Sequence, residues 1–209
     1  MTTYRTIQKA AQAEFIDRRS RFIGQIQPVT SEAEAQAFIE SVKKRYWDAR
    51  HHVPAYILRD GDIRRFSDDG EPQGTAGMPT LDVLQKQNLT DCVVVITRYF
   101  GGILLGGGGL VRAYSHTASL AIEAAGVVEM RPALLMEINC SYTQYGWLAA
   151  LIEAGGGTVV DTAYTDTVTV RMLLDADLLG VFEKQLTERS AGSLQPSVLE
   201  EQYRAVPIF

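Results

Sequence analysis

The sequence has 209 residues, of which 46% are hydrophobic, with 20 basic and 25 acidic side chains. This length and composition are typical of one or two globular domains. No run of about 18 uninterrupted apolar residues is present, which excludes a membrane-spanning helix, and we expect no secretory signal at the N-terminus. The two cysteines, Cys92 and Cys140, lie in apolar runs. They suit buried free thiols in a reducing compartment, so we expect a cytoplasmic protein.

The charge is distributed unevenly along the chain. Residues 1–130 contain 15 basic and 15 acidic side chains, whereas residues 131–209 contain 5 basic and 10 acidic ones. An acidic surface is a poor partner for the phosphates of a nucleic acid. We therefore expect phosphate contacts from the N-terminal part, and we expect the acidic C-terminal part to supply shape or a contact with a protein partner.

The first 130 residues predict strands and helices in a mixed order. The expected elements are a strand at 22–29, a helix after the capping box Ser31–Glu34, a hairpin of strands 53–58 and 63–66, a loop at 67–78, a short helix at 79–88, a central strand at 92–96 and a helix at 110–125. The loop is long for a compact domain and lacks periodicity, which suggests that it has a function.

The remaining residues follow a simpler pattern. The expected elements are a strand at 134–142, a helix at 145–154, strands at 158–164 and 168–174, a helix at 178–189 and a strand at 198–203. The resulting βαββαβ order is that of a ferredoxin-like domain. We therefore predict an α+β protein with an N-terminal domain at 1–130 and a ferredoxin-like C-terminal domain at 131–209.

The best candidate for a binding site is a glycine-rich segment between the central strand and the following helix. Glycine lets the backbone approach a ligand closely, and the first N–H groups of a helix attract anions. Arginine side chains suit phosphate, and a tyrosine ring can stack on a base. The candidate ligands of phosphate or RNA are Arg98, Tyr99, Gly101, Gly102, Gly106, Gly108, Gly109 and Arg112. The alternative is that the glycines only allow a tight turn.

Three carboxylates in the loop before this strand, Asp68, Asp69 and Glu71, are expected to border the same face. They would position the arginines or meet a basic protein, although side-chain bonds that build a turn are the interpretation we favour. Of the adjacent His51 and His52, only one can face a given site, because side chains alternate along a strand. No nucleophile or metal-ligand motif is recognised. We therefore name no catalytic residue, metal or cofactor.

Several of these motifs together carry a resemblance to a known family. They are Ser20-Arg21-Phe22-Ile23, Ala49-Arg50-His51-His52, the run from Ser67 to Gly77 and the run from Arg98 to Tyr114. The sequence resembles the YigZ/IMPACT family in its bacterial two-domain branch. It departs from the family pattern at Val53 and Pro54, and at Gly107. The resemblance implies an N-terminal domain similar to the second domain of ribosomal protein S5, and a C-terminal domain similar to the last domain of elongation factor G.

The resemblance leads to one main hypothesis and two alternatives. The main hypothesis is a non-enzymatic, cytoplasmic regulator of translation or ribosome-associated factor, which binds RNA or nucleotide phosphate through the glycine-rich segment. The first alternative is an enzyme acting on a phosphorylated small molecule or nucleotide, because the S5-like fold also resembles small-molecule kinases. The second is a protein adaptor that binds no nucleic acid.

Overall fold

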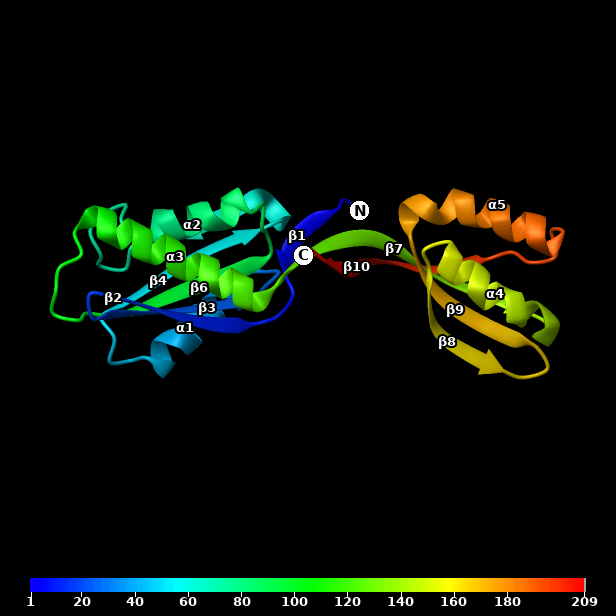
Figure 1. Ribbon diagram of the computed structural model, residues 1–209, viewed down its shortest axis with the longest axis horizontal. Coiled ribbons are helices and arrows are strands. Elements are labelled where there is room, and N and C mark those ends of the chain that lie inside the picture. The colour runs from blue at the N-terminus through cyan, green and yellow to red at the C-terminus, as the bar shows by residue number, and fades with distance from the viewer. Residues whose placement is uncertain (209) are drawn as a thin grey trace. The chain divides into compact units, whose positions relative to one another are not determined.

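The structure is a computed structural model that describes residues 1–208. It divides into two compact units (Figure 1). The N-terminal unit comprises Tyr4–Glu129 with residues 206–208, and the C-terminal unit comprises Met130–Ala205 with Met1–Thr3. The two chain ends therefore group differently from a simple division after residue 130. The reason is that contacts in space, and not order along the chain, define a compact unit.

The N-terminal unit contains a five-stranded antiparallel sheet with the order β2-β3-β6-β4-β5. Its strands are β2 (Ala11–Asp17), β3 (Ser20–Pro28), β4 (His51–Leu58), β5 (Ile63–Phe66) and β6 (Cys92–Tyr99); a short strand β1 (Tyr4–Ile7) precedes them, and a 3-10 turn η1 (Asp60–Asp62) joins β4 to β5. Strand β6 lies in the middle of the sheet, and its residues from Cys92 to Ile96 are fully buried. This confirms the predicted central strand.

Helices cover both faces of this sheet. Helix α1 (Glu32–Arg45) packs on one face, and helices α2 (Gly77–Lys86) and α3 (Gly107–Ala125) pack on the other (Figure 1). Side chains of β6 alternate between the two cores: Val93 and Val95 pack with α1, whereas Val94 and Ile96 pack with α2 and α3. A strand with both faces covered is expected to be apolar throughout, as β6 is.

Helix α3 begins at Gly107, earlier than the sequence predicts. Glycine has a low helix propensity, so the glycine run was expected to be loop. The Leu110 N–H nevertheless donates to the Gly106 carbonyl at 2.9 Å, which closes the first helical turn among the glycines. The predicted apolar stripe of the helix is confirmed. Its buried members are Leu110, Ala113, Tyr114, Thr117, Ala118 and Ala121.

The C-terminal unit has the predicted βαββαβ order. Its elements are most of β7 (Val127–Cys140), α4 (Tyr142–Ala154), β8 (Thr158–Tyr164), β9 (Val168–Asp175), the 3-10 turn η2 (Ala176–Leu178), α5 (Leu179–Ser190) and most of β10 (Ser197–Pro207). Strand β7 pairs with both β9 and β10, and β8 pairs with β9. Apolar side chains such as Ile138, Met172 and Phe182 form a separate core. The α+β fold class is therefore confirmed.

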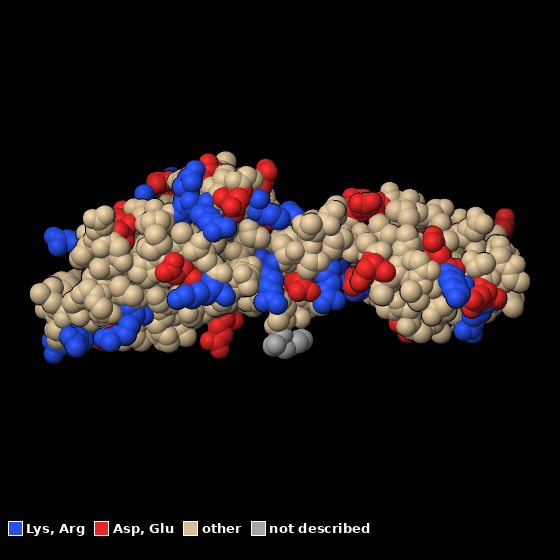
Figure 2. Space-filling model, turned by 90° about the horizontal axis from the view of Figure 1, so that it is seen from above, with Lys and Arg blue, Asp and Glu red and all other residues tan. Residues whose placement is uncertain are grey.

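The surface of the molecule carries both signs of charge. On the face shown in Figure 2, Lys and Arg side chains gather mainly over the N-terminal unit, with Asp and Glu side chains between them. No helix within residues 1–208 is long and apolar enough to cross a membrane.

Candidate anion-binding site

The candidate site lies where strand β6 ends, strand β4 begins and helix α3 begins. His51 of β4 pairs with Arg98 of β6, which brings the two side chains to the same edge of the sheet. A cavity of about 380 Å³ lies there, and we call it the α3 cavity. It is lined by Arg50, His51, Glu71, Pro72, Arg98, Phe100, Leu104, Leu105, Gly106, Gly107 and Leu110.

Arg98 is the buried cation of this cavity, with 6% of its surface exposed. Its Nη1 donates to both carboxylate oxygens of Glu71, at 2.7 and 2.9 Å. The Tyr114 hydroxyl donates to Glu71 Oε1 at 2.8 Å, and Arg98 Nη2 makes a long contact of 3.5 Å with Ser20 Oγ. Arg98 is therefore not the free cation that the sequence suggested. Its Nε, however, has no hydrogen-bond partner among the described residues.

The N-terminus of helix α3 opens beside this guanidinium. Gly107, Gly108 and Gly109 precede the first helical hydrogen bond, so their N–H groups have no acceptor within the helix. No side chain caps the helix at Gly106, and Gly106 to Gly108 are exposed. The helix dipole places about half a positive charge at this end. The cavity thus combines backbone donors with a partly unpartnered guanidinium.

The glycines of this segment have different functions. A Cβ on Gly101 would clash with the backbone carbonyl carbon of Arg19, and the Gly101 N–H donates to Ser20 Oγ at 3.2 Å. Gly101 is therefore needed for packing and has no donor left for a ligand. A Cβ on Gly108, by contrast, would meet nothing within 4 Å. The space beside Gly108 is open to an incoming group.

His51 contributes an acceptor to the cavity. Its Nδ1 lies 2.8 Å from the Asp69 backbone oxygen, which can only accept a hydrogen bond. Nδ1 therefore carries a proton, and in the neutral ring Nε2 carries the lone pair. His52 is buried, and its Nε2 contacts the Tyr46 backbone oxygen at 2.9 Å. Only one of the two adjacent histidines lines the α3 cavity.

The three loop carboxylates are engaged within the chain. Asp68 accepts hydrogen bonds from the N–H groups of Gly74, Ala76 and Gly77 at 2.8, 3.1 and 2.8 Å, and Asp69 Oδ2 accepts from the His52 N–H at 2.6 Å. Burial acts to raise the pKa of Asp68, but the backbone donors outweigh it and lower the pKa below its ordinary value. These carboxylates order the loop, and within residues 1–208 no cluster of ligands suited to a metal ion is found.

Of the predicted ligands, only Arg98 and Gly106 line the α3 cavity, which corrects the predicted grouping. The others are Tyr99, Gly101, Gly102, Gly108, Gly109 and Arg112. Tyr99 follows Arg98 on the strand, and alternation sends it to the opposite face. There its hydroxyl donates to Asp48 Oδ1 at 2.7 Å, and this bond together with burial raises the pKa of Tyr99 to about 12. Arg112 lines a different cavity, beside Asp17 and His116. At about 100° per residue, Arg112 is turned well away from Gly107 around the helix.

Sequence reasoning missed several lining residues as ligands. Arg50, His51 and Phe100 lie in the wall of the cavity, together with Leu104. Strand alternation would have found Phe100, because residues two apart share a face and Arg98 precedes it by two positions. The pairing of His51 with Arg98 required the strand register, which the sequence alone does not contain.

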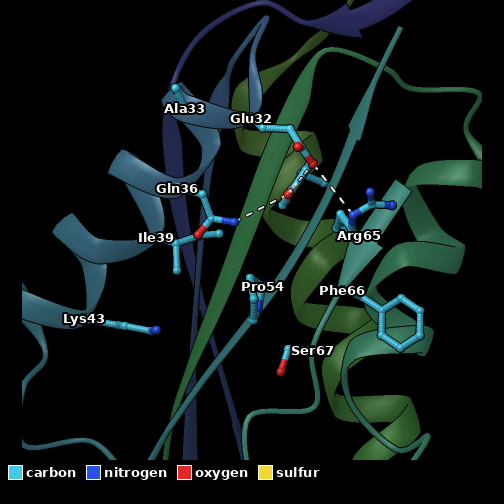
Figure 3. Close-up of a pocket in the computed structure, with 10 residues that line it drawn as sticks. Glu32, Ala33, Gln36, Ile39, Lys43, Pro54, Arg65, Phe66 and Ser67 are labelled. Carbon is cyan, nitrogen blue, oxygen red and sulfur yellow. Dashed lines mark hydrogen bonds and ion pairs between the residues drawn. The ribbon is translucent and has the colours of Figure 1, made fainter. Parts of the chain in front are cut away.

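A larger cavity of about 590 Å³ lies between α1 and strands β4 and β5 (Figure 3). We call it the α1 groove. Its polar side chains satisfy one another: the Tyr56 hydroxyl donates to Glu32 Oε1 at 3.1 Å and accepts from Gln36 Nε2 at 3.4 Å, while Arg65 Nε lies 3.7 Å from Glu32 Oε1. None of its lining side chains has a buried polar atom without a partner. The α3 cavity is therefore the better candidate, despite its smaller volume.

Comparisons with known proteins cover both units. Residues 18–122 match the Impact N-terminal domain, and residues 138–193 match a domain of unknown function, DUF1949. The chain is 37% identical over 191 residues to IMPACT family member YvyE of Bacillus subtilis, covering 91% of this chain and 88% of the relative. It is 36% identical over 187 residues to IMPACT family member YigZ of Escherichia coli, covering 88% of this chain and 92% of the relative.

Two further comparisons extend these findings. Protein IMPACT of Xenopus laevis is 34% identical over 96 residues, which covers 43% of this chain and 30% of that protein. A crystal structure of a protein described as hypothetical superimposes with a TM-score of 0.60 at 33% sequence identity, covering 96% of this chain and 98% of the other. The similarity to the bacterial relatives therefore spans both units, whereas the similarity to the frog protein covers less than half of the chain.

Proposed function

Because the chain belongs to the IMPACT family, we propose that it acts in the regulation of translation, as a cytoplasmic, ribosome-associated factor that binds RNA or nucleotide phosphate in the α3 cavity. The family resemblance supports the link to translation. The phosphate site is supported by the chemistry of the cavity wall. The role is that of a binding protein.

The observation that carries the proposal is the unpartnered Nε of Arg98. This donor is buried, yet it has no partner within residues 1–208. A buried donor without a partner costs about 1–3 kcal/mol. An oxygen of a bound phosphate would restore that hydrogen bond, and Gly107, whose N–H has no acceptor within the helix, lines the same cavity. A bound phosphate would thus supply the hydrogen-bond acceptor that Arg98 Nε lacks.

The charges of the cavity also favour an anion. Arg98 and Glu71 neutralise each other, which leaves the exposed Arg50 and the positive end of the α3 dipole. The dipole contributes about half a charge, so the cavity remains positive. Phosphodiester binding needs such a positive surface, because displacement of counterions from the nucleic acid drives it.

An apolar wall accompanies these donors. Phe100 is 51% exposed and Leu104 is 80% exposed. Arg18 Nη1 donates to the Leu104 carbonyl at 3.3 Å, which anchors the segment that carries these side chains. Exposed aromatic rings stack on unpaired bases with little dependence on sequence. In this proposal Phe100 takes the stacking role that the sequence assigned to Tyr99.

The test compares two variants that lower the net charge equally. Gly108→Asp places a carboxylate at the open end of α3, where a Cβ meets nothing within 4 Å and where acidic residues stabilise a helix. Arg112→Ala removes a charge from the same helix but outside the cavity. Fluorescence anisotropy with a labelled single-stranded RNA, and competition by mononucleotides, measure the affinity. We expect at least a tenfold loss for Gly108→Asp and little change for Arg112→Ala. Wild-type affinity in Gly108→Asp would contradict the proposal.

The other two classes of function make different predictions. An enzyme acting on a phosphorylated molecule needs a nucleophile or base, and burial raises the pKa of Cys92 to about 12, which keeps its thiol protonated. The Asp69 carboxylate is the loop group to test as a base, but its Oδ2 accepts a hydrogen bond from the His52 N–H at 2.6 Å. Turnover that Asp69→Asn abolishes would favour an enzyme. An adaptor would bind a protein partner, while the wild-type chain shows no affinity for RNA or nucleotide.

A further inference from the structure

We propose that His51 recognises the ribose 2′-hydroxyl next to the bound phosphate, so that the α3 cavity selects ribonucleotides over deoxyribonucleotides. This inference rests on the proposed phosphate site and names the ligand class that the site accepts. It depends on three features of His51. Its tautomer is fixed, it lies beside Arg98, and it is a hydrogen-bond acceptor in a cavity whose other available polar groups are mostly donors.

The tautomer of His51 is set by the chain. The Asp69 backbone oxygen accepts the proton of Nδ1 at 2.8 Å. Gly70 lies near the same side of the ring, since a Cβ built there would be 3.4 Å from Nδ1. Nε2 lies on the other side of the imidazole ring and has no hydrogen-bond partner within residues 1–208. The neutral ring is therefore held in place and presents the lone pair of Nε2 as an acceptor.

The position of His51 is fixed by strand pairing. His51 and Arg98 are partners in the antiparallel register of β4 and β6. Paired residues on one face of such strands have Cβ atoms about 4.5–5.5 Å apart. Both side chains line the α3 cavity together with Gly106 and Gly107. A group that His51 binds therefore lies next to a phosphate that Arg98 and the α3 N–H groups bind.

The cavity is otherwise rich in donors. Its lining includes two side-chain acceptors, His51 and Glu71. Glu71 is occupied, because Oε1 accepts from both Arg98 and Tyr114 and Oε2 accepts from Arg98. A phosphate has only acceptor oxygens and does not use Nε2. A ligand that carries a donor close to its phosphate would therefore complement His51, and the 2′-hydroxyl of ribose is such a group.

The experiment compares three oligonucleotides of one uridine-rich sequence: RNA, DNA containing deoxyuridine, and 2′-O-methyl RNA. The 2′-O-methyl form keeps the oxygen but loses the donor. We expect the wild-type chain to bind RNA about five- to tenfold more tightly than either of the others, which corresponds to one net hydrogen bond. His51→Ala should bind all three equally, at the wild-type affinity for DNA. His51→Gln, which retains an acceptor, should recover part of the preference.

His116→Ala provides the matched control, because His116 is an exposed histidine of α3 that lines a different cavity. It should keep the preference for RNA. Equal binding of RNA and DNA by the wild-type chain, or a preference that survives His51→Ala, would overturn the inference while leaving the phosphate site intact. A wild-type chain that binds none of the oligonucleotides would overturn the proposed function as well.

Discussion

The α3 cavity and the α1 groove belong to the same unit, but their polar groups are used differently. In the α1 groove, Glu32, Gln36 and Arg65 all contact one another or the Tyr56 hydroxyl. In the α3 cavity, Arg98 Nε and the first N–H groups of α3 are left without partners among the described residues. Unused hydrogen-bonding capacity, and not volume, is therefore what makes the α3 cavity the better candidate for a binding site.

The two regions also differ in how deeply they bury charge. The side chains of Arg98 and Glu71 are 7% and 3% exposed, whereas those of Arg65 and Glu32 are 60% and 46% exposed. Exposed ion pairs contribute about 0–1 kcal/mol. Removal of one partner from a buried pair costs about 3–5 kcal/mol, because the other charge is left buried alone. Stability measurements on matched variants therefore test the comparison directly.

The largest effect is expected for Glu71→Gln. The variant keeps the shape of the side chain and an acceptor for Tyr114, but it leaves Arg98 as an unpaired buried charge. We expect the free energy of unfolding of the N-terminal unit to fall by about 3–5 kcal/mol, as measured by hydrogen exchange of the β6 amides. Glu32→Gln in the α1 groove is the matched control, with an expected loss below about 1 kcal/mol. Equal losses would show that the two pairs do not differ as described.

The next effect separates two glycines of the glycine-rich segment between β6 and α3. Gly101→Ala forces a Cβ against the backbone of Arg19, and overpacking of this kind costs about 1–3 kcal/mol or more. In Gly108→Ala the added Cβ meets no neighbour, and alanine replaces glycine, which is a poor helix former. The free energy of unfolding of the unit should therefore rise by up to about 1 kcal/mol. Urea denaturation followed by circular dichroism measures both changes. A destabilised Gly108→Ala variant would mean that the open space beside α3 is occupied in the folded chain.

A smaller effect concerns Asp68 and depends on pH. Since folding lowers the pKa of Asp68, its contribution to stability is present above the ordinary aspartate value of about 3.9 and is lost as the pH falls through the lower folded value. Asp68→Asn should therefore be less stable than the wild-type chain at pH 7, and the difference should shrink below about pH 4. Urea midpoints at pH 7 and pH 3 give the comparison. A difference that does not depend on pH would assign the effect to shape alone.

The smallest effect is expected for Arg65→Ala. The side chain is exposed, and its ion pair with Glu32 spans 3.7 Å. We expect a change in the free energy of unfolding below about 1 kcal/mol, and an unchanged affinity for RNA in the anisotropy measurement. A clear loss of RNA affinity would move the phosphate contacts toward the α1 groove and remove the distinction between the two regions.

Much of the fold could be predicted from local pattern. The apolar run from Cys92 to Ile96 predicts a strand buried on both faces, and strand β8 has the predicted bounds, Thr158–Tyr164. These features depend on the order of apolar and polar residues, which the sequence contains. The early strands β1 and β2 were missed. Strand β2 is half-buried with exposed positions at every second residue, a weak signal in a segment that contains charged residues.

The sequence by itself determined the α+β architecture, the βαββαβ order of the C-terminal unit and the glycine-rich junction after β6. Periodicity and turn residues are local properties of the sequence, and they do not depend on which distant residues pack together. Only the tertiary structure decided that Arg98 pairs with Glu71, 27 residues earlier in the chain, and that Tyr99 and Arg112 lie elsewhere. The charge state and partners of a side chain depend on which distant residues share its cavity, and strand register and burial set that arrangement.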